Sequence, residues 1–199
     1  MTRHPTIVLA SSSPYRKELL GRVITNFETL SPDIDESPLD NEPPETLARR
    51  LAVKKAEVVA QHYENALIVG SDQVAFLNNQ IIGKPNSHEE AVAQLQRSSG
   101  STVTLFTGLA LINSNSGNIQ STVEQYEVEF RILDRPSIER YLELDRPYDC
   151  CGSLKTEGMG ISLLKRLTGN DPNTLIGLPL IALITMLAEE GVNPLDYGS

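Results

Sequence analysis

The sequence contains no long hydrophobic run. Its first apolar segment, Ile7 to Ala10, is far shorter than the roughly 20 residues that a membrane-spanning helix needs, and it is too short for the core of a secretion signal. Of the 199 residues, 40% are hydrophobic and 22% are charged, the balance of a globular protein with a real core. We therefore expect a soluble, cytoplasmic protein that forms a single domain over residues 1–199 and has no membrane partner.

Cysteine is nearly absent, since only Cys150 and Cys151 occur. Adjacent cysteines rarely form a relaxed disulfide, and neither has a second partner elsewhere in the chain. The pair therefore fits a reducing compartment. A vicinal redox pair is the functional alternative.

Basic residues are outnumbered, with 17 lysines and arginines against 26 acidic residues and a net charge of -9. This balance excludes non-specific attraction to a nucleic-acid polymer, so any phosphate site must be locally basic. The chain also has no Walker A motif. Its three histidines are scattered without the spacing of metal ligands.

Hydrophobic patterns predict alternating strands and helices, with one large antiparallel hairpin near the middle of the chain. Residues 148–160 are expected to form a glycine-rich loop with short extended pieces. The predicted strands are Thr6–Ala10, Phe27–Leu30, Ala66–Gly70, Val74–Leu77, Thr102–Asn113 and Ile119–Leu133. One helix is predicted to begin at Pro14. The other predicted helices are Glu45–Tyr63, His88–Arg97, Pro136–Leu144 and Pro179–Glu190.

A serine-rich loop, Ser11 to Ser13, separates the first predicted strand from the helix that begins at Pro14. Hydroxyls, backbone amides and Arg16 at a helix N-terminus favour anions, which indicates a triphosphate cradle. Serine is also a routine helix cap, so simple capping is an equal alternative.

Asp72 follows a buried apolar run in Gly70-Ser-Asp-Gln, which we place at the carboxyl end of the strand. Open α/β sheets bind ligands there, and a carboxylate in that place can hold a metal ion or accept a proton from water. Capping of a turn is the structural alternative.

Other polar residues fit a nucleotide site less specifically. Lys84 stands in a rigid Gly-Lys-Pro turn, and Asp35 and Glu36 lie in a proline-rich acidic loop that could reach a divalent metal. Residues 155–160 form a polar loop with small residues that permit close approach to a base. Solvated surface positions and an ordinary turn are the alternatives.

Taken in chain order, six short motifs resemble those of the Maf family of nucleotide pyrophosphatases: Ala10-Ser-Ser-Ser-Pro-Tyr-Arg, Asp35-Glu36, Lys55-Ala56, Gly70-Ser-Asp72, Gly83-Lys84-Pro85 and Gly177-Leu178-Pro179. Three further stretches resemble the branch of this family that acts on 7-methyl-GTP: Gly70-Ser-Asp-Gln-Val, Cys151-Gly-Ser-Leu-Lys-Thr-Glu-Gly and Asp171-Pro-Asn-Thr-Leu. The resemblance implies a mixed α/β, Maf/ITPase-like fold, with a strongly twisted sheet of long antiparallel strands, flanking helices and two lobes around a central cleft.

The resemblance also implies roles for individual residues. Asp72 is the expected catalytic proton acceptor, and Glu36 and Asp72 the expected ligands of a divalent cation, Mg²⁺ or Mn²⁺. Ser11, Arg16, Lys55 and Lys84 are expected to bind phosphate, and Tyr15, Gln73 and Glu157 to choose the substrate. A homodimer and a role in clearing modified nucleotides are further expectations from the family.

Tyr15 departs from the arginine of many Maf proteins that prefer thymidine and uridine triphosphates. Guanine methylated at N7 is positively charged, so an aromatic ring can stack on it with a cation–π gain of roughly 0.5 to 2 kcal/mol, whereas an arginine would repel it. Glu157 can accept hydrogen bonds from the N1 and N2 donors of guanine. We therefore expect 7-methyl-GTP as substrate.

The expected reaction is attack of water on the α-phosphorus, giving 7-methyl-GMP and pyrophosphate. Asp72 either activates this water or only holds the metal, since a carboxylate serves both purposes. Three other functions remain alternatives: a pyrophosphatase that prefers dTTP or UTP, a phosphatase or GTPase that cuts at the γ-phosphate, and a non-catalytic nucleotide-binding regulator of cell division.

Overall fold

The structure is a computed structural model that describes residues 5–197. The chain divides into two compact units. Unit 1 holds the described residues up to Asp72, Thr107–Glu124, and the described residues from Asp171 onward; unit 2 holds Gln73–Phe106 and Gln125–Asn170. The single domain over residues 1–199 stays a prediction. Among the described residues, no helix is long and apolar enough to cross a membrane.

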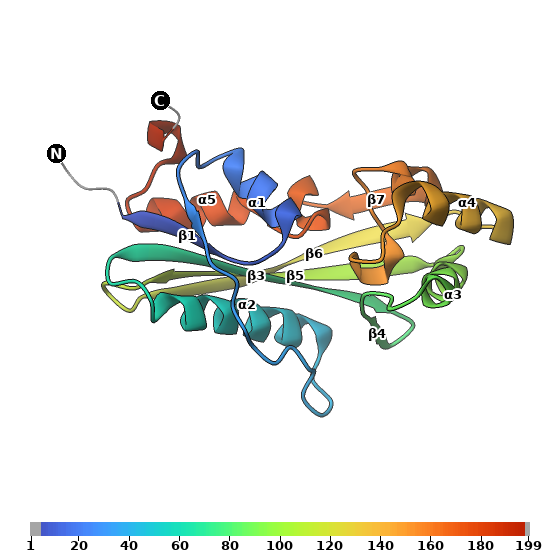
Figure 1. Cartoon of the computed structure of the whole chain (residues 1–199), viewed down its shortest axis with the longest axis horizontal. Helices are drawn as coiled ribbons and strands as arrows, with labels where there is room; N and C mark the ends of the chain where they lie inside the picture. Colours follow the sequence, from blue (N-terminus) through green and yellow to red (C-terminus); the bar gives the residue numbers. More distant parts are fainter. Residues whose placement is uncertain (1–4, 198–199) are drawn as a thin grey trace. The chain divides into compact units, whose positions relative to one another are not determined.

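The helices and strands follow one another in a mixed order (Figure 1). The strands are β1 (Thr6–Ala10), β2 (Glu28–Thr29), β3 (Ala66–Leu77), β4 (Gln80–Ile82), β5 (Thr102–Asn113), β6 (Ile119–Phe130) and β7 (Leu164–Gly169). The α-helices are α1 (Pro14–Gly21), α2 (Pro44–Ala60), α3 (His88–Ser98), α4 (Arg135–Asp145) and α5 (Leu180–Glu189). Short 3₁₀ helices are η1 (Cys151–Ser153), η2 (Met159–Leu163), η3 (Pro172–Leu175) and η4 (Pro194–Tyr197).

The predicted mixed α/β architecture is confirmed. The strands form a 7-stranded sheet in the order β2-β1-β3-β5-β6-β7, with β4 paired to β3. Strand β1 is parallel to both β2 and β3, and its last residue, Ala10, lies opposite Gly70. Strands β4 and β7 are antiparallel to β3 and β6. The long strands β3, β5 and β6 each contribute residues to both units, and the predicted central cleft stays a prediction.

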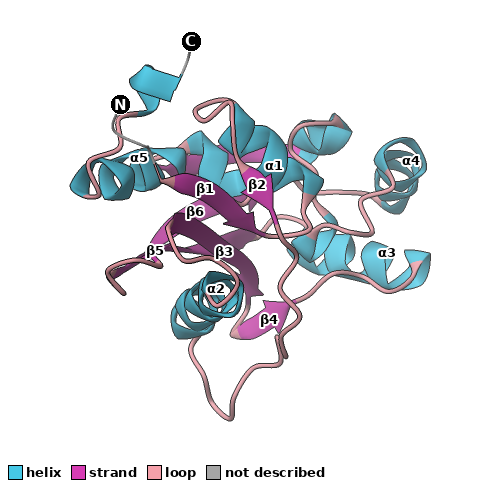
Figure 2. Cartoon of the chain, turned by 60° about the vertical axis from the view of Figure 1, so that its left-hand side comes forward, coloured by secondary structure: helices cyan, strands magenta, loops and turns pink. Residues whose placement is uncertain are grey.

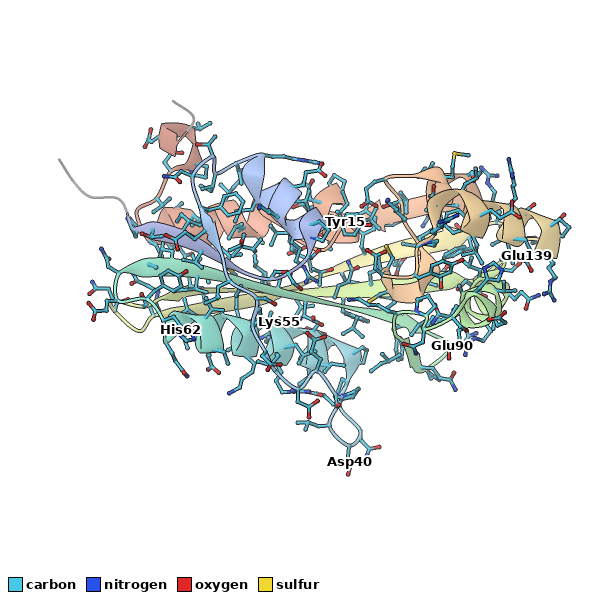
Figure 3. The ribbon with its side chains drawn as sticks, viewed as in Figure 1. Tyr15, Asp40, Lys55, His62, Glu90 and Glu139 are labelled. Carbon is cyan, nitrogen blue, oxygen red and sulfur yellow. The ribbon has the colours of Figure 1, made fainter. Side chains whose placement is uncertain are left out.

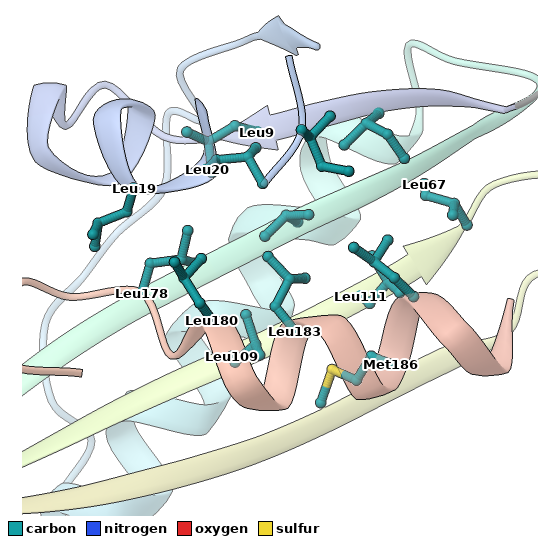
Figure 4. Close-up of a cluster of buried hydrophobic side chains, with 14 of the residues drawn as sticks. Leu9, Leu19, Leu20, Leu67, Leu109, Leu111, Leu178, Leu180, Leu183 and Met186 are labelled. Carbon is teal, nitrogen blue, oxygen red and sulfur yellow. The ribbon is translucent and has the colours of Figure 1, made fainter. Parts of the chain in front are cut away.

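In unit 1, alternate residues of the strands pack on two different helical layers. Helices α1 and α5 cover one face of the sheet and α2 covers the other, as Figures 1 and 2 both show. The first face buries Ile7, Leu9, Leu67, Val69, Leu109 and Leu111 against leucines of α1 and against Leu180, Leu183 and Met186 of α5 (Figure 4). The second face buries Val8, Ala10, Ile68, Ala110 and Ile112 against Ala52, Ala56 and Val59 of α2. Residues of even number on β1 and β3 therefore face α2, and those of odd number face α1 and α5.

Helix α2 lies unusually close to the sheet because two glycines face it. A Cβ atom added to Gly70 would lie 2.2 Å from the carbonyl oxygen of Ala52, and one added to Gly108 would lie 2.1 Å from that of Ala48. Real side chains do not tolerate such distances, and the opposing atoms belong to rigid helical backbone. The backbone of β3 and β5 therefore touches the backbone of α2 directly, which only glycine permits.

Unit 2 contains the remaining parts of β3, β5 and β6 together with α3 and α4. The turn Asn78–Asn79, with φ values of 50° and 61°, closes the β3–β4 hairpin. His88, at the start of α3, lies 2.6 Å through Nε2 from Glu139 of α4 and 2.9 Å through Nδ1 from the hydroxyl of Tyr148. The hydrogen bond to His88 lowers the pKa of the Glu139 carboxyl, although desolvation opposes it. Figure 3 labels Glu139 on α4.

Three details of the prediction were wrong. Strand β3 runs without a break from Ala66 to Leu77, so Asp72 lies inside a strand and not at its carboxyl end. Strand β7 was not predicted, and residues 148–160 contain η1 and the start of η2 where extended pieces were expected. The predicted strand at Phe27–Leu30 is reduced to two residues, Glu28 and Thr29.

Replacing Gly70 by alanine should lower the free energy of unfolding by about 3 kcal/mol or more, the upper end of overpacking costs, because the new methyl group meets backbone that cannot rotate away. Urea unfolding would measure the change. Gly21→Ala is the matched control in the same unit, since its nearest new contact is Phe27 Cε1 at an ordinary 3.9 Å. A Gly70→Ala protein as stable as the control would contradict the close approach of α2.

Candidate active site

Lys55 stands at the centre of a charged cluster in unit 1. Its Nζ atom is 2.6 Å from Oδ1 of Asp72 and 2.7 Å from Oε1 of Glu36. The side chains of Lys55 and Asp72 are only 8% and 11% exposed, whereas that of Glu36 is 57% exposed. One positive and two negative charges leave the cluster with one net negative charge. The structure thus brings together three of the residues predicted for the site.

The close approach of α2 to β3 explains how Lys55 reaches Asp72. Lys55 belongs to a buried stripe on the sheet-facing side of α2, in which residues are spaced four apart: Leu47, Leu51, Lys55 and Val59. Figure 3 labels Lys55 on this helix. The neighbouring Lys54 is 56% exposed, so the basic residues of α2 do not form one positive face.

Asp72 lies just beyond the end of β1. The parallel pairing of β1 with β3 ends at Ala10 and Gly70, and the loop Ser11–Ser13 leaves the sheet at that point. By the alternation along β3, Asp72 points to the α2 side and Ser71 to the side of α1 and α5. Side chains on both faces of β3 therefore lie next to the point where β1 ends.

The serine loop caps helix α1. Ser11 is buried, and its Oγ accepts a hydrogen bond from the backbone amide of Ser13 at 3.1 Å. Ser13 is the N-cap residue, and its Oγ accepts one from the amide of Arg16 at 3.4 Å. The capping interpretation is confirmed. Phosphate binding by Ser11 stays a prediction, and Tyr15 lies half-buried in the first turn of α1 (Figure 3).

Arg16 is held by the C-terminal part of unit 1. Its Nε donates to the carbonyl oxygen of Gly177 at 2.8 Å, which crosses 161 positions of sequence. The same carbonyl accepts a hydrogen bond from the buried hydroxyl of Ser71 at 2.9 Å. The motif Gly177-Leu178-Pro179 thus contributes to the site through its backbone.

The acidic loop that carries Glu36 is fastened to α2 by Arg50 and Glu42. Arg50 donates to both carboxylate oxygens of Glu42, at 2.6 and 2.7 Å, and to the carbonyl of Ser37 at 3.0 Å. The hydrogen bond from Arg50 lowers the pKa of the nearly buried Glu42 carboxyl. Asp35 accepts a hydrogen bond from the backbone amide of Ser37 at 2.9 Å. Hydrogen bonds from Ser37 lower the pKa of the Asp35 carboxyl. Of the predicted acidic pair, Glu36 is therefore the one that reaches Lys55.

Unit 2 holds the remaining predicted residues. Gln73 follows Asp72 on β3, and its carbonyl accepts a hydrogen bond from the thiol of Cys151 at 3.6 Å. Lys84 is exposed beside Gly83, whose carbonyl accepts from the amide of Gly152 at 3.2 Å. The turn at residues 151–152 thus links the segments that carry Gln73 and Lys84.

Two residues of α4 anchor the loop that carries Glu157. The hydroxyl of Tyr141 accepts from the amide of Lys155 at 2.9 Å and donates to the carbonyl of Ser153 at 3.2 Å. Burial raises the pKa of Tyr141, which keeps its hydroxyl protonated. Asp145 accepts from the amide of Gly160 at 3.2 Å, while Glu157 itself is exposed. Sequence reasoning missed both anchors.

Two carboxylates of unit 1 are the residues that could hold a divalent cation together with a substrate. Among residues 5–197, no group of three or more histidine, cysteine and acidic side chains could hold a metal alone. Mg²⁺ is usually bound by one or two carboxylates together with water and substrate phosphates, so it does not need a complete protein cage. Glu36 and Asp72, which share Lys55, supply such a pair.

The family model described as Maf-like protein matches residues 6–190, and the chain therefore belongs to the Maf family. Three curated relatives are named 7-methyl-GTP pyrophosphatase. The relative from Nitrosococcus oceani is 52% identical over 94% of this chain and 94% of its own; that from Idiomarina loihiensis is 52% identical over 96% and 97%. The relative from Pseudomonas aeruginosa is 53% identical over 94% and 98%.

Among solved structures, that of the Staphylococcus aureus Ham1 protein is similar to the chain with a TM-score of 0.46 and 12% sequence identity. The match covers 63% of this chain and 71% of the Ham1 chain.

Replacing Lys55 by methionine should lower the free energy of unfolding by about 3 kcal/mol, because it leaves the carboxylate of Asp72 buried without its cation. Lys54→Met, one position away but exposed, should change it by less than about 0.5 kcal/mol. Adding Asp72→Asn to Lys55→Met should restore part of the loss. Urea unfolding of the four proteins tests the pair, and equal effects of Lys54→Met and Lys55→Met would contradict it.

Proposed function

We propose that this protein is a nucleoside triphosphate pyrophosphatase that hydrolyses 7-methyl-GTP to 7-methyl-GMP and pyrophosphate and so clears a modified nucleotide. The observation that carries the proposal is the 52 to 53% identity to three relatives named 7-methyl-GTP pyrophosphatase over at least 94% of the chain. The cluster of the buried Lys55 and Asp72 with the exposed Glu36 supplies a chemical centre suited to this reaction.

Asp72 is the proposed proton acceptor. Lys55 engages Oδ1, which fixes the carboxylate and leaves Oδ2 for a water molecule. The oxygen of this water attacks the α-phosphorus, its proton passes to Asp72, and the bond from the α-phosphorus to the bridging oxygen breaks. Pyrophosphate leaves with that oxygen.

Phosphate binding is assigned to Ser11, Arg16, Lys55 and Lys84. The triphosphate is strongly anionic, whereas the cluster around Lys55 carries a net negative charge, so further positive charge is required. Glu36 and Asp72 would hold Mg²⁺ or Mn²⁺, which when bound supplies charge that neutralises phosphate oxygens.

Substrate choice is assigned to Tyr15, Gln73 and Glu157. The ring of Tyr15 offers a stacking surface for the positively charged base. The carboxylate of Glu157 is an acceptor for the N1 and N2 donors of guanine. The anchoring of its loop by Tyr141 and Asp145 supports this role, because a recognition group must be held in place.

The cytoplasm is the proposed compartment, and a homodimer is the proposed assembly. The scarcity of cysteine supports the first of these, because structural disulfides are rare in reducing compartments. The homodimer rests on the family alone.

Product analysis tests the proposal. The purified protein with magnesium would be incubated in parallel with 7-methyl-GTP, GTP, dTTP and UTP. We expect pyrophosphate and monophosphate, mainly from 7-methyl-GTP. Asp72→Asn should lower kcat by about 100-fold or more, the usual effect of losing a general base. Orthophosphate would indicate cleavage at the γ-phosphate, and binding without product would indicate a non-catalytic regulator.

The same panel tests the assigned specificity. Glu157→Gln should reduce the preference for 7-methyl-GTP over GTP by roughly tenfold, because a neutral amide attracts a cationic base less strongly than a carboxylate does. Glu143→Gln, an exposed change on α4, is the control. An unchanged preference would remove Glu157 from this role, and a wild-type preference for dTTP or UTP would contradict the substrate but not the reaction.

A further inference from the structure

We infer that Ser71 is a positioning residue that aims the guanidinium of Arg16 at the substrate's phosphates through the carbonyl oxygen of Gly177. The inference rests on the proposed function, since it concerns how that site grips its triphosphate. All three residues belong to unit 1.

Ser71 is a fully buried polar residue inside β3. It has 0% exposure, and its Oγ lies 2.8 Å from the carbonyl oxygen of Gly108 and 2.9 Å from that of Gly177. The hydroxyl has one proton, which these two acceptors share. Ser71 thereby ties β3 to β5 and to the segment that precedes α5.

The carbonyl of Gly177 receives a second donor. Nε of Arg16 lies 2.8 Å from it, so both lone pairs of this oxygen are used. An arginine held through Nε has a restrained guanidinium plane, and among residues 5–197 no hydrogen bond or ion pair occupies its two terminal nitrogens, which can therefore bind a ligand. This is the arrangement that a bidentate grip on phosphate needs.

The segment around Gly177 is built to hold its carbonyl at this angle. Gly177 has φ of +110°, a conformation that favours glycine, and an added Cβ would lie 3.3 Å from Nε of Arg16. Its amide donates to the carbonyls of Asn173 and Thr174, both at 3.1 Å. Asp171 in turn accepts from the amides of Asn173 and Ile181, both at 2.8 Å. The carbonyl therefore has little freedom to turn.

The position of Ser71 on β3 makes the arrangement functional. Its neighbour Asp72 carries the proposed catalytic carboxylate toward α2, while Ser71 points to the opposite side, where Arg16 lies. Strand β3 thus positions the carboxylate of Asp72 directly and the guanidinium of Arg16 indirectly, through Ser71 and the carbonyl of Gly177. A rigid strand is more suitable for this than a loop.

The test is a double-mutant cycle on 7-methyl-GTP hydrolysis, with kcat and KM measured for wild type, Ser71→Ala, Arg16→Ala and the double variant. Ser71→Ala should reduce kcat/KM by roughly tenfold, the value of about one good hydrogen bond, and should do so mainly through KM. In the Arg16→Ala background it should change kcat/KM by less than about twofold, because its target is gone. Arg16→Lys, which lacks Nε and leaves the buried hydroxyl intact, should be as impaired as Arg16→Ala.

Thr107→Val is the matched control. Thr107 is also fully buried and donates its hydroxyl to the carbonyl of Thr174 at 3.1 Å, in the same segment but not at Gly177. It should leave KM within about twofold of wild type. A loss equal to that of Ser71→Ala, or effects of Ser71→Ala and Arg16→Ala that multiply, would overturn the inference in favour of general loosening of the segment.

Calorimetric binding of inorganic pyrophosphate separates this inference from the proposed function. Pyrophosphate affinity that falls in both Ser71→Ala and Arg16→Ala but not in Thr107→Val supports the inference even if no nucleotide is hydrolysed, a result that would contradict the function alone. Affinity that is unchanged by Ser71→Ala, or an absence of binding by the wild type, would overturn the inference.

Discussion

The chemistry of unit 1 depends on how closely helix α2 approaches the sheet. Gly70 and Gly108 remove the two side chains that would hold the helix away, and the carbonyls of Ala52 and Ala48 occupy their space. At this distance the side chain of Lys55, which belongs to the buried stripe of α2, ends beside Asp72. A buried ammonium requires a carboxylate partner, so the approach of the backbone and the ion pair depend on each other.

The cluster around Lys55 is a compromise between folding and substrate binding. Two carboxylates satisfy the buried ammonium, but their combined charge repels a triphosphate. For the proposed function, Arg16, Lys84 and a divalent cation would supply the positive charge that offsets this repulsion. The net charge of -9 does not oppose this proposal, since the charge near a site decides whether the site attracts a polyanion.

Much of the fold could be predicted because its core follows simple periodicities. Strand β1 and helices α1, α2 and α5 have the expected apolar patterns, and Ser13 has the expected capping role. Strand β3 was interrupted in the prediction because Ser71, Asp72 and Gln73 are polar. The strand continues because Ser71 donates to buried carbonyls and Asp72 pairs with Lys55, partners that are 17 or more positions away and leave no local signal. Strand β7 has little alternation and only an edge position beside β6, so its sequence resembles a loop.

The site was predictable from its motifs more than from its contacts. The burial of Lys55 had a signal that was not used, since it lies four residues from Leu51 and Val59 on one helix face. The ion pair of Glu42 with Arg50, which fastens the acidic loop, had no signal in the sequence. The conformation of the loop decides which acidic residue meets the arginine. The hydrogen bond between Arg16 and the carbonyl of Gly177 also had no signal in the sequence, because the two residues are 161 positions apart.

Hydrolysis of 7-methyl-GTP in ¹⁸O-labelled water would show whether a water molecule beside Asp72 attacks the α-phosphorus, as we propose. Mass spectrometry of the products would show which phosphorus received the oxygen. Attack at the α-phosphorus puts the label in 7-methyl-GMP and not in pyrophosphate. Label in pyrophosphate, or release of labelled orthophosphate in its place, would contradict it.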